Sequence, residues 1–337
     1  MKSFTHLDTF SINDAYKALG EYEGKARLNA GGSDLLAILK GDVLNDYPET
    51  IINIKTIPGL DYIREDGDYL RIGALARLSD IVRSPLLNEK YRLLAEAAHT
   101  IASPQIRNVA TLGGNICQDT RCWYYRYPRK IGGPIQCLRK GRGACLAVRG
   151  DNRYHAIMGG KKCFAVCPSD MAVALAALDG RLKIAGPKGE RSVAVAEFFH
   201  PLGKDLARDE IVREIEIPAR RVPSQQTFLK FTLRKPIDFA IVSVASVVTI
   251  EQGVCTDARI ILGAVAPFPV RAKVAEELLI GKPISEEIAI ASAEEALTGS
   301  KPLSKNSYKI QIAKTLVKQA VFSSMEAGEM LHPFQNF

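Results

Sequence analysis

The sequence predicts an α+β protein of two or three domains. Its 337 residues are enough for that many ordinary domains. Helix-like and strand-like segments alternate over residues 1–115, whereas the last third holds strand-like segments followed by helix-like ones. Strands that run together before a group of helices are typical of an α+β layer. One long span, residues 116–168, shows neither the helical nor the strand periodicity of apolar residues over most of its length.

The first 115 residues predict mixed α and β structure. A helix is expected over 11–19, and "ARLNAGGSDLLAILKG" reads as strand, glycine turn and helix, with Ser33 or Asp34 as the helix cap. "TIINIKTIPGL" alternates like a strand that ends at its Pro-Gly pair. "YLRIGALARLSDIV" predicts a strand that passes into a helix, and "EKYRLLAEAAHTIAS" predicts one further helix.

Regular structure resumes after the irregular span. "SDMAVALAALDG" predicts a helix with Ser169 or Asp170 as its cap and Gly180 as its stop, and "RLKIAG" and "EIVREIEIP" predict strands. A boundary is expected at 218–224. Beyond it we expect strands over 227–234, 240–250 and 258–266, then helices near 271–281, 285–298 and 307–330.

The composition indicates a protein of the reducing cytoplasm. No apolar run approaches the ~20 residues that span a bilayer, and the N-terminus lacks the apolar core of a secretory signal. Cysteines of cytoplasmic proteins rarely form structural disulfides, and clusters of them more often bind metal.

Positive charge and cysteine are both concentrated in residues 116–168. This span has eleven Lys/Arg against Asp119 and Asp151, a net +9, so the rest of the chain, whose total is +8, carries −1. Six of the seven cysteines also lie in the span. Cys255 stands alone in an apolar stretch and is expected to be a small buried hydrophobe.

Two glycine pairs predict turns that approach a ligand. "NAGGSDLL" (29–36) and "ATLGGNI" (110–116) each combine glycines with polar residues at an expected helix start. Such turns bring backbone N–H groups close to an anion. Each turn alone is a weak signal, and neither is a P-loop or the three-glycine dinucleotide fingerprint. Together they modestly favour a ligand with a pyrophosphate and an extended polar chain.

The cysteine spacing predicts a metal centre in the irregular span. Cysteines occur at 117, 122, 137, 145, 163 and 167. Paired Cys-x2–4-Cys units would indicate structural zinc, which stays possible, whereas single thiolates from separate turns suit a cubane iron–sulfur cluster equally well. A thiolate-bound cluster is an anion that a +9 segment would stabilise. Trp123, Tyr124, Tyr125 and Tyr127 would screen it from water.

Other functions have less support in the sequence. Basic residues interleaved with aromatic ones can bind nucleic acid, so a zinc-loop nucleic-acid-binding protein is a weaker alternative. No Gly-x-Ser-x-Gly or His-Glu-x-x-His motif indicates a hydrolase, and the five histidines form no close pair.

Five stretches together resemble a known family over essentially the full length. They are "NAGGSDLL", "ASPQIRNVATLGGNI", "PSDMAVALAALDG", "DEIVREIEIP" and "FLKFTLRKPIDFAIVSVA". The chain is similar to the FAD-binding medium subunit of molybdenum hydroxylases. The resemblance implies a two-subdomain FAD-binding fold of the vanillyl-alcohol oxidase/PCMH type, with subdomains at 1–55 and 56–220. A C-terminal α+β domain, similar to that of CO dehydrogenase flavoproteins, would cover 224–331.

The insertion at 116–168 narrows the resemblance. Most medium subunits lack such a loop, whereas the 4-hydroxybenzoyl-CoA reductase β subunit has one that holds a [4Fe–4S] cluster. Resemblance to it nominates four ligands: Cys122, Cys137, Cys145 and Cys163. The loop departs from that pattern by being longer before Cys163 and by having the extra Cys167. Cys167 is therefore an alternative fourth ligand, and Cys117 a less favoured one.

The resemblance also implies the flavin contacts. The first glycine turn would cradle the pyrophosphate with Ala30, Gly31, Gly32, Ser33, Asp34 and Leu35. The second would line the other side with Thr111, Gly114 and Asn115. Asp170 would bind the ribityl or adjoining polar part, and Val212 and Lys230 would approach the isoalloxazine ring.

The function implied is electron transfer between an external carrier and partner subunits. The partners would be a large molybdopterin subunit and a small subunit with two [2Fe–2S] clusters, assembled as a dimer of heterotrimers. As in an anaerobic, aromatic-degrading reductase, electrons would enter from a ferredoxin-like donor at the [4Fe–4S] cluster, and the basic loop would steer an acidic donor. The alternative is a xanthine, N-heterocycle or other aromatic dehydrogenase that passes electrons outward.

Overall fold

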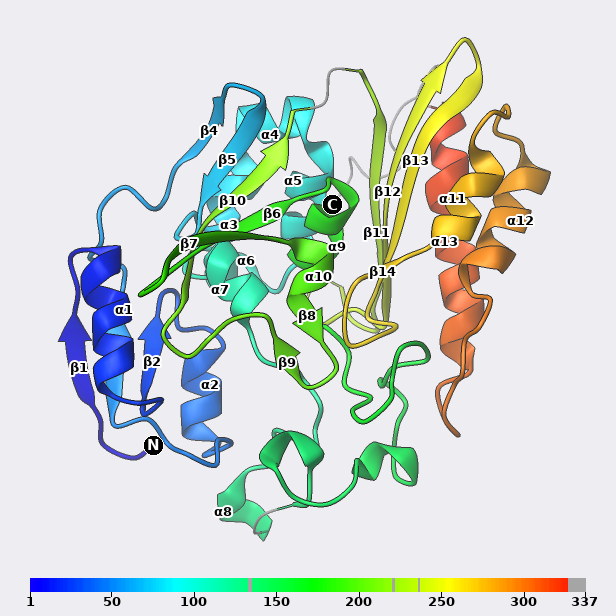
Figure 1. Ribbon diagram of the computed structural model, residues 1–337. Coiled ribbons are helices and arrows are strands. Elements are labelled where there is room, and N and C mark those ends of the chain that lie inside the picture. Colours follow the sequence, from blue (N-terminus) through cyan, green and yellow to red (C-terminus); the bar gives the residue numbers. More distant parts are fainter. Residues whose placement is uncertain (133–134, 220–221, 236, 327–337) are drawn as a thin grey trace.

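The computed structural model describes residues 1–132, 135–219, 222–235 and 237–326. In Figure 1 the small N-terminal unit lies at the left, a sheet with its helices lies in the middle, and a second sheet with the C-terminal helices lies at the right. Strands are followed by helices at the C-terminal end, as the sequence predicted.

The N-terminal unit is a three-stranded parallel sheet with two helices. Its elements are β1 (Thr5–Asp8), α1 (Ile12–Glu21), β2 (Ala26–Asn29), α2 (Leu35–Lys40) and β3 (Thr50–Asn53), with strand order β1-β3-β2. The side chain of Ser11 caps α1 by accepting from the Asp14 N–H at 3.1 Å. The short β1 was not predicted, because its residues are mostly exposed and lack a clear apolar alternation.

A five-stranded antiparallel sheet forms the middle of the molecule. Its order is β4 (Ile63–Asp66), β5 (Tyr69–Gly73), β10 (Ile211–Pro218), β6 (Arg181–Gly186), β7 (Gly189–Ala194). Side chains alternate between its faces. Buried apolar residues such as Ile72 and Ile215 point into the main core, whereas Arg71 and Glu214 belong to the opposite, charged face.

Helices cover the apolar face of this sheet. They are α3 (Leu78–Arg83), α4 (Pro85–Lys90), α5 (Arg92–His99), α6 (Pro104–Arg107), α7 (Leu112–Cys117), α9 (Asp170–Ala177) and α10 (Val195–Phe198). The helix predicted over 89–103 is present as α5 but is shorter, because Tyr91 leaves helical geometry (φ −130°) and separates it from α4. Ser169, one of two caps considered for α9, accepts from the Ala172 N–H at 3.0 Å.

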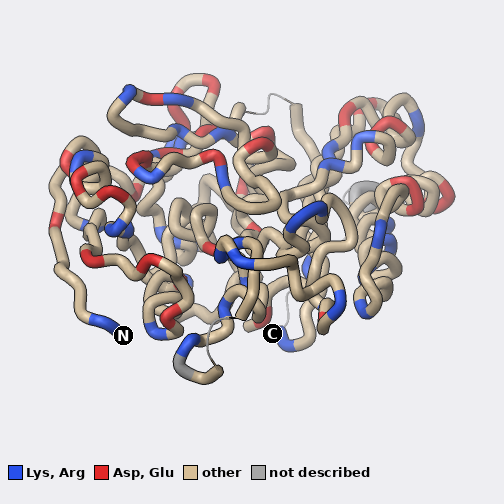
Figure 2. The backbone as a smooth tube through the Cα atoms, turned by 60° about the horizontal axis from the view of Figure 1, so that its bottom comes forward, with Lys and Arg blue, Asp and Glu red and all other residues tan. Residues whose placement is uncertain are grey.

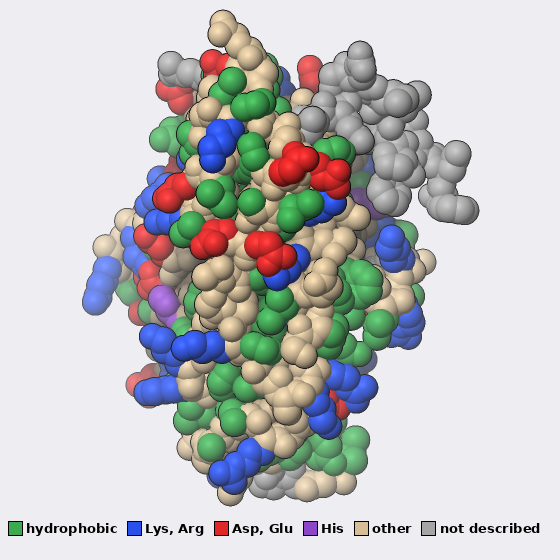
Figure 3. Space-filling view, turned by 90° about the vertical axis from the view of Figure 1, so that its right-hand side faces the viewer, with side chains coloured by type: hydrophobic (Ala, Val, Ile, Leu, Met, Phe, Trp, Pro, Cys, Tyr) green, Lys and Arg blue, Asp and Glu red, His purple; other side chains and the backbone are tan. Residues whose placement is uncertain are grey.

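The C-terminal part is a four-stranded sheet with helices on its outer face. Its elements are β11 (Gln225–Phe231), β12 (Val242–Glu251), β13 (Val254–Gly263), β14 (Val270–Arg271), α11 (Lys273–Leu279), α12 (Glu286–Ala296) and α13 (Tyr308–Glu326). Figure 3 views the molecule from the right-hand side of Figure 1, and on that face hydrophobic side chains are scattered among charged ones. The predicted end of the last helix at 330, and of the domain at 331, lies outside the described residues.

Most of the irregular span, residues 116–168, lies below the five-stranded and the four-stranded sheet in Figure 1. It contains α8 (Arg129–Gly132) and two 3-10 turns (Leu138–Lys140 and Leu146–Val148). A separate short hairpin, β8 (Phe199–His200) and β9 (Gly203–Lys204), lies outside this span and precedes β10 in the sequence. Asn306 Nδ2 and Lys309 Nζ, both on fully buried residues, donate to the His155 carbonyl at 3.0 and 3.1 Å. The C-terminal part therefore orders the second half of this loop directly.

Candidate functional site

The two glycine turns lie against each other around one pocket of about 410 Å³. A Cβ on Gly31 would stand 1.9 Å from the Val109 carbonyl oxygen, so only glycine fits where the first turn meets the chain entering the second. Gly32 has a φ of +69°, in the left-handed region that favours glycine. We call this cavity the flavin pocket, for the ligand that the sequence predicted there.

The flavin pocket presents backbone donors without partners. Within the described residues, the N–H groups of 31–34 make no hydrogen bond, and the buried Oδ1 of Asn29 has none either. Three cationic side chains also line the pocket: Arg27, Lys204 and Arg208. Burial and the neighbouring Arg208 lower the pKa of Arg27, as expected where like charges face each other. Free amides beside cations suit an anionic group such as a diphosphate.

Most of the predicted flavin residues line this pocket. They are Ala30, Gly31, Gly32, Ser33, Asp34, Leu35, Thr111, Gly114 and Val212. Asn115, Asp170 and Lys230 are not among the lining residues. Lys230 Nζ pairs instead with Asp170 Oδ2 at 2.8 Å in a buried bridge, and Asn115 Oδ1 accepts from the Ser169 hydroxyl at 2.7 Å. The first contact joins strand β11 to the start of α9, and the second joins α7 to the residue that caps α9.

Asp34 does not cap α2, contrary to one of the two sequence alternatives. Its carboxylate turns to the cysteine loop, where it pairs with Arg121 and Arg126 and accepts from the Asp119 N–H at 2.7 Å. Burial alone would raise the pKa of Asp34, but the two guanidinium groups outweigh it and hold the pKa below its usual value.

The loop cysteines divide into two groups. Cys122 and Cys137 belong to a small cluster with Ile38 and Val43, whereas Cys117 and Cys167 pack against the main core. Burial raises the pKa of Cys122 to about 11, with Cys137 and Cys163 adding to the shift. Burial also raises the pKa of Cys137, with contributions from Cys163 and Cys145. The thiols whose charge raises the pKa of Cys122 or Cys137 are thus all among the four predicted ligands.

Further donors surround the first of these thiols. Backbone N–H groups of Tyr124 and Tyr125 bond the Cys122 sulfur, and His155 Nε2 lies 3.2 Å from it. Trp123 packs edge-on against the His155 ring at 5.6 Å. Even so, the described residues contain no group of three or more His, Cys, Asp or Glu side chains arranged to hold a single metal ion. Cys255, outside the loop, is fully buried as predicted.

Much of the loop's positive charge points inward rather than to solvent. Arg121 and Arg126 bind Asp34, and Arg139 lies 3.7 Å from Asp119. Lys140 is buried beside the Tyr125 ring. The exposed basic side chains of the loop include Arg142, Arg149, Arg153, Lys161 and Lys162. Figure 2, with the bottom of the molecule forward, shows basic positions along this loop.

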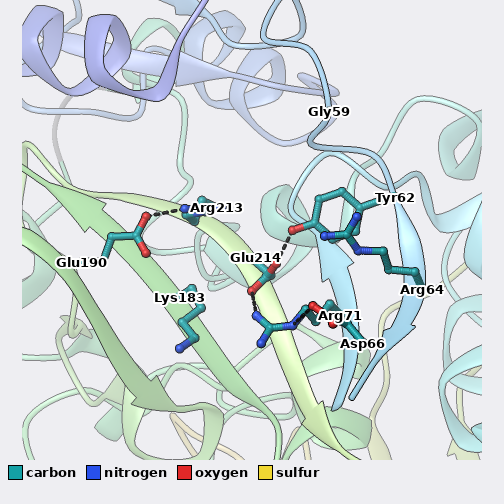
Figure 4. A pocket seen from close by; sticks show the side chains of 9 residues that line it. All are labelled: Gly59, Tyr62, Arg64, Asp66, Arg71, Lys183, Glu190, Arg213 and Glu214. Carbon is teal, nitrogen blue, oxygen red and sulfur yellow. Dashed lines mark hydrogen bonds and ion pairs between the residues drawn. The ribbon is translucent and has the colours of Figure 1, made fainter. Parts of the chain in front are cut away.

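A second pocket, of about 500 Å³, opens on the charged face of the five-stranded sheet (Figure 4). Tyr62 donates to Glu214, which also pairs with Arg71 at 2.9 Å. Lys183 pairs with Glu216 at 2.8 Å, and Arg213 pairs with Glu190. We call it the charged pocket. Its charges largely neutralise one another, so it offers little to an ionic ligand.

Known protein families match most of the chain. A family model described as "FAD binding domain in molybdopterin dehydrogenase" matches residues 2–220, and the "CO dehydrogenase flavoprotein C-terminal domain" matches residues 227–323. This chain belongs to the FAD-binding medium subunits of the molybdenum hydroxylase family. The resemblance inferred from the five sequence stretches is therefore confirmed, as is the fold class.

Individual relatives resemble this medium subunit along nearly their full length. The aldehyde oxidoreductase FAD-binding subunit PaoB of Escherichia coli is 32% identical over 93% of this chain and 96% of its own. The carbon monoxide dehydrogenase medium chain of Hydrogenophaga pseudoflava is 29% identical over 92% and 93%. A solved structure of that dehydrogenase superposes with a TM-score of 0.77 at 28% identity, covering 96% of this chain and 98% of its own.

The residues of the flavin pocket fit FAD. The free amides of 31–34 and the cations around them suit its pyrophosphate, and glycine is the residue that leaves room at Gly31. Sequence reasoning missed the segments at 26–29 and 204–211, which also line the pocket. They carry no glycine pair or motif, and only their basic residues hinted at an anion.

None of the described helices is both long enough and apolar enough to cross a bilayer.

Proposed function

We propose that this medium subunit carries FAD in the flavin pocket and one [4Fe–4S] cluster on Cys122, Cys137, Cys145 and Cys163. The observation that supports the cluster is the packing of Cys122 and Cys137 in one small apolar cluster, together with the N–H groups directed at Cys122. Hydrogen bonds to sulfur and burial are the means by which proteins tune such clusters. Cys167 is the weaker fourth ligand, because it packs into the main core away from the small cluster.

The proposed role is to pass electrons between an external carrier and the molybdenum-containing part of a complex. Bound FAD supplies both one-electron and two-electron chemistry, which lets it connect a one-electron cluster to other centres. The partners we propose are a large molybdopterin subunit and a small subunit with two [2Fe–2S] clusters, in a dimer of heterotrimers. We also propose domain limits of 1–55, 56–220 and 224–331. The N-terminal core cluster, mostly within residues 15–60, and the C-terminal cluster, mostly within 241–321, support them.

Metal and sulfide analysis of oxygen-protected protein tests the cluster. We expect iron and acid-labile sulfide in equal amounts, about four of each per chain, with an EPR signal on reduction. Cys122→Ser should lose the cluster, whereas Cys255→Ser, a matched change at a buried thiol elsewhere, should retain it. One equivalent of zinc without sulfide would contradict the cluster and favour a structural zinc loop.

The first candidate for the external carrier is a ferredoxin that delivers electrons inward. Exposed Arg142, Arg149, Lys161 and Lys162 support it, because a basic face attracts an acidic carrier at low ionic strength. The rate of ferredoxin-dependent flavin reduction should fall steeply as salt is raised. A salt-insensitive rate would contradict docking on this loop.

A second candidate is a dehydrogenase that passes electrons outward. It is favoured by the names of relatives, which include an aldehyde oxidoreductase and a carbon monoxide dehydrogenase. The substrate would be an aldehyde, a purine, an N-heterocycle or another aromatic compound. Purified complex mixed with each substrate without oxygen should bleach the flavin absorbance in the outward case. Reduction by ferredoxin alone, with no response to any substrate, would favour the inward direction.

A further inference from the structure

The turn that lines the flavin pocket and the loop that carries the cysteines share one carboxylate. The backbone of Asp34 lies in the glycine turn that lines the flavin pocket. Its side chain, only 15% exposed, points the other way and pairs with Arg121 and, at 2.7 Å, with Arg126. Arg121 immediately precedes Cys122. Asp34 therefore joins the two regions through its own backbone and side chain.

The contacts around this carboxylate extend over the start of the cysteine loop. Besides binding Asp34, Arg126 donates to the carbonyls of Thr120 and Asp119 at 2.5 and 3.0 Å. Arg121 also donates to Gln118 Oε1 at 2.8 Å. The segment is thus folded around the two guanidinium groups, and both point at the turn. Losing the carboxylate would leave two partly buried positive charges side by side.

A second, apolar contact joins the same regions. The helix that follows the glycine turn contributes Ile38, which with Val43 forms a cluster with Tyr125 and Cys137. Asn45 Nδ2 donates to the Lys140 carbonyl at 2.6 Å just beyond. Movement of the turn would accordingly be transmitted to two of the proposed cluster ligands.

We propose that Asp34 is a positioning residue that couples flavin binding to retention of the iron–sulfur cluster; this rests on the proposed function. A ligand that fills the flavin pocket fixes the turn, and the turn fixes the carboxylate and the loop around Cys122. Linkage makes the effect reciprocal, so the cluster favours flavin binding by the same factor that flavin favours cluster binding.

The first test uses the full-length chain purified without oxygen with both cofactors. Flavin is removed reversibly, and cluster loss to an iron chelator is followed by its visible absorbance and by EPR. Loss should be about tenfold faster without flavin, within the usual range of coupling between sites, and adding FAD back should restore the slow rate. Equal rates with and without flavin would overturn the coupling.

The second test compares Asp34→Asn with Asp80→Asn, whose carboxylate pairs with Arg83 at the exposed surface. Asp34→Asn should weaken FAD binding, speed cluster loss and remove its dependence on flavin, while Asp80→Asn should behave as wild type. Unchanged coupling in Asp34→Asn would overturn the role of this residue. If the chain binds FAD and the cluster independently of each other, this inference alone is refuted. If the chain never holds iron and sulfide, both the proposed function and this inference are refuted.

Discussion

The two pockets of this chain differ in what they leave unpaired. In the charged pocket, Glu214 is bound by both Tyr62 and Arg71. Lys183 and Arg213 also have ion-pair partners, although the Nε atoms of Arg71 and Arg213 make no hydrogen bond in the described chain. In the flavin pocket, the amides of 31–34 and the buried Asn29 Oδ1 have none in the described chain. The turn is partly exposed, so water or a ligand can satisfy its amides. A run of free backbone amides therefore indicates a binding site at the flavin pocket, whereas the acidic side chains of the charged pocket are already paired.

The largest effect should come from closing the flavin pocket at Gly31. Gly31→Ala places a methyl group 1.9 Å from the Val109 carbonyl oxygen, which forces the two glycine turns apart. We expect FAD affinity to fall at least about a hundredfold, about 3 kcal/mol. Titration of the flavin-free chain with FAD, followed by fluorescence, measures it.

Gly20→Ala is the matched control. Nothing lies within 4 Å of a Cβ at this position in α1. Alanine should leave FAD affinity unchanged and stabilise the helix by up to about 1 kcal/mol. If Gly31→Ala bound FAD as tightly as Gly20→Ala, the flavin would have to lie elsewhere.

Local sequence patterns predicted the flavin pocket better than they predicted which side chains pair with each other. The glycine turns could be located because close backbone approach leaves a mark in the sequence. The Asp170–Lys230 pair joins residues 60 positions apart, and no local pattern records which partner a charge will find. Asp34 shows the same limit: its neighbours favoured a helix cap, but two arginines 87 and 92 residues away bind it instead. The charged pocket left no motif because its residues come from five strands and a preceding loop.

A smaller effect is expected from the charged pocket. Glu214→Gln keeps the side-chain shape but removes the charge that Arg71 and Tyr62 bind. The free energy of unfolding should fall by about 2 kcal/mol, because a nearly buried ionic network loses a member. Urea unfolding measures this loss, and FAD titration should give the wild-type affinity. A large loss of FAD affinity with unchanged stability would make the charged pocket a ligand site and reverse the comparison.

The smallest effect is a pH dependence within the charged pocket. Burial, together with the hydrogen bond to Glu214, raises the pKa of Tyr62 from 10.0 to about 12. Between these values the folded chain keeps a proton that the unfolded chain has lost, so stability present below pH 10 declines as the pH rises. Between about pH 9 and pH 11, wild type should lose about 1 kcal/mol more unfolding free energy than Tyr62→Phe, after allowance for partial exposure. Urea unfolding at the two pH values measures it. Parallel losses in both proteins would mean that the hydroxyl is not held by Glu214 in solution, and that the charged pocket is less completely paired than its geometry indicates.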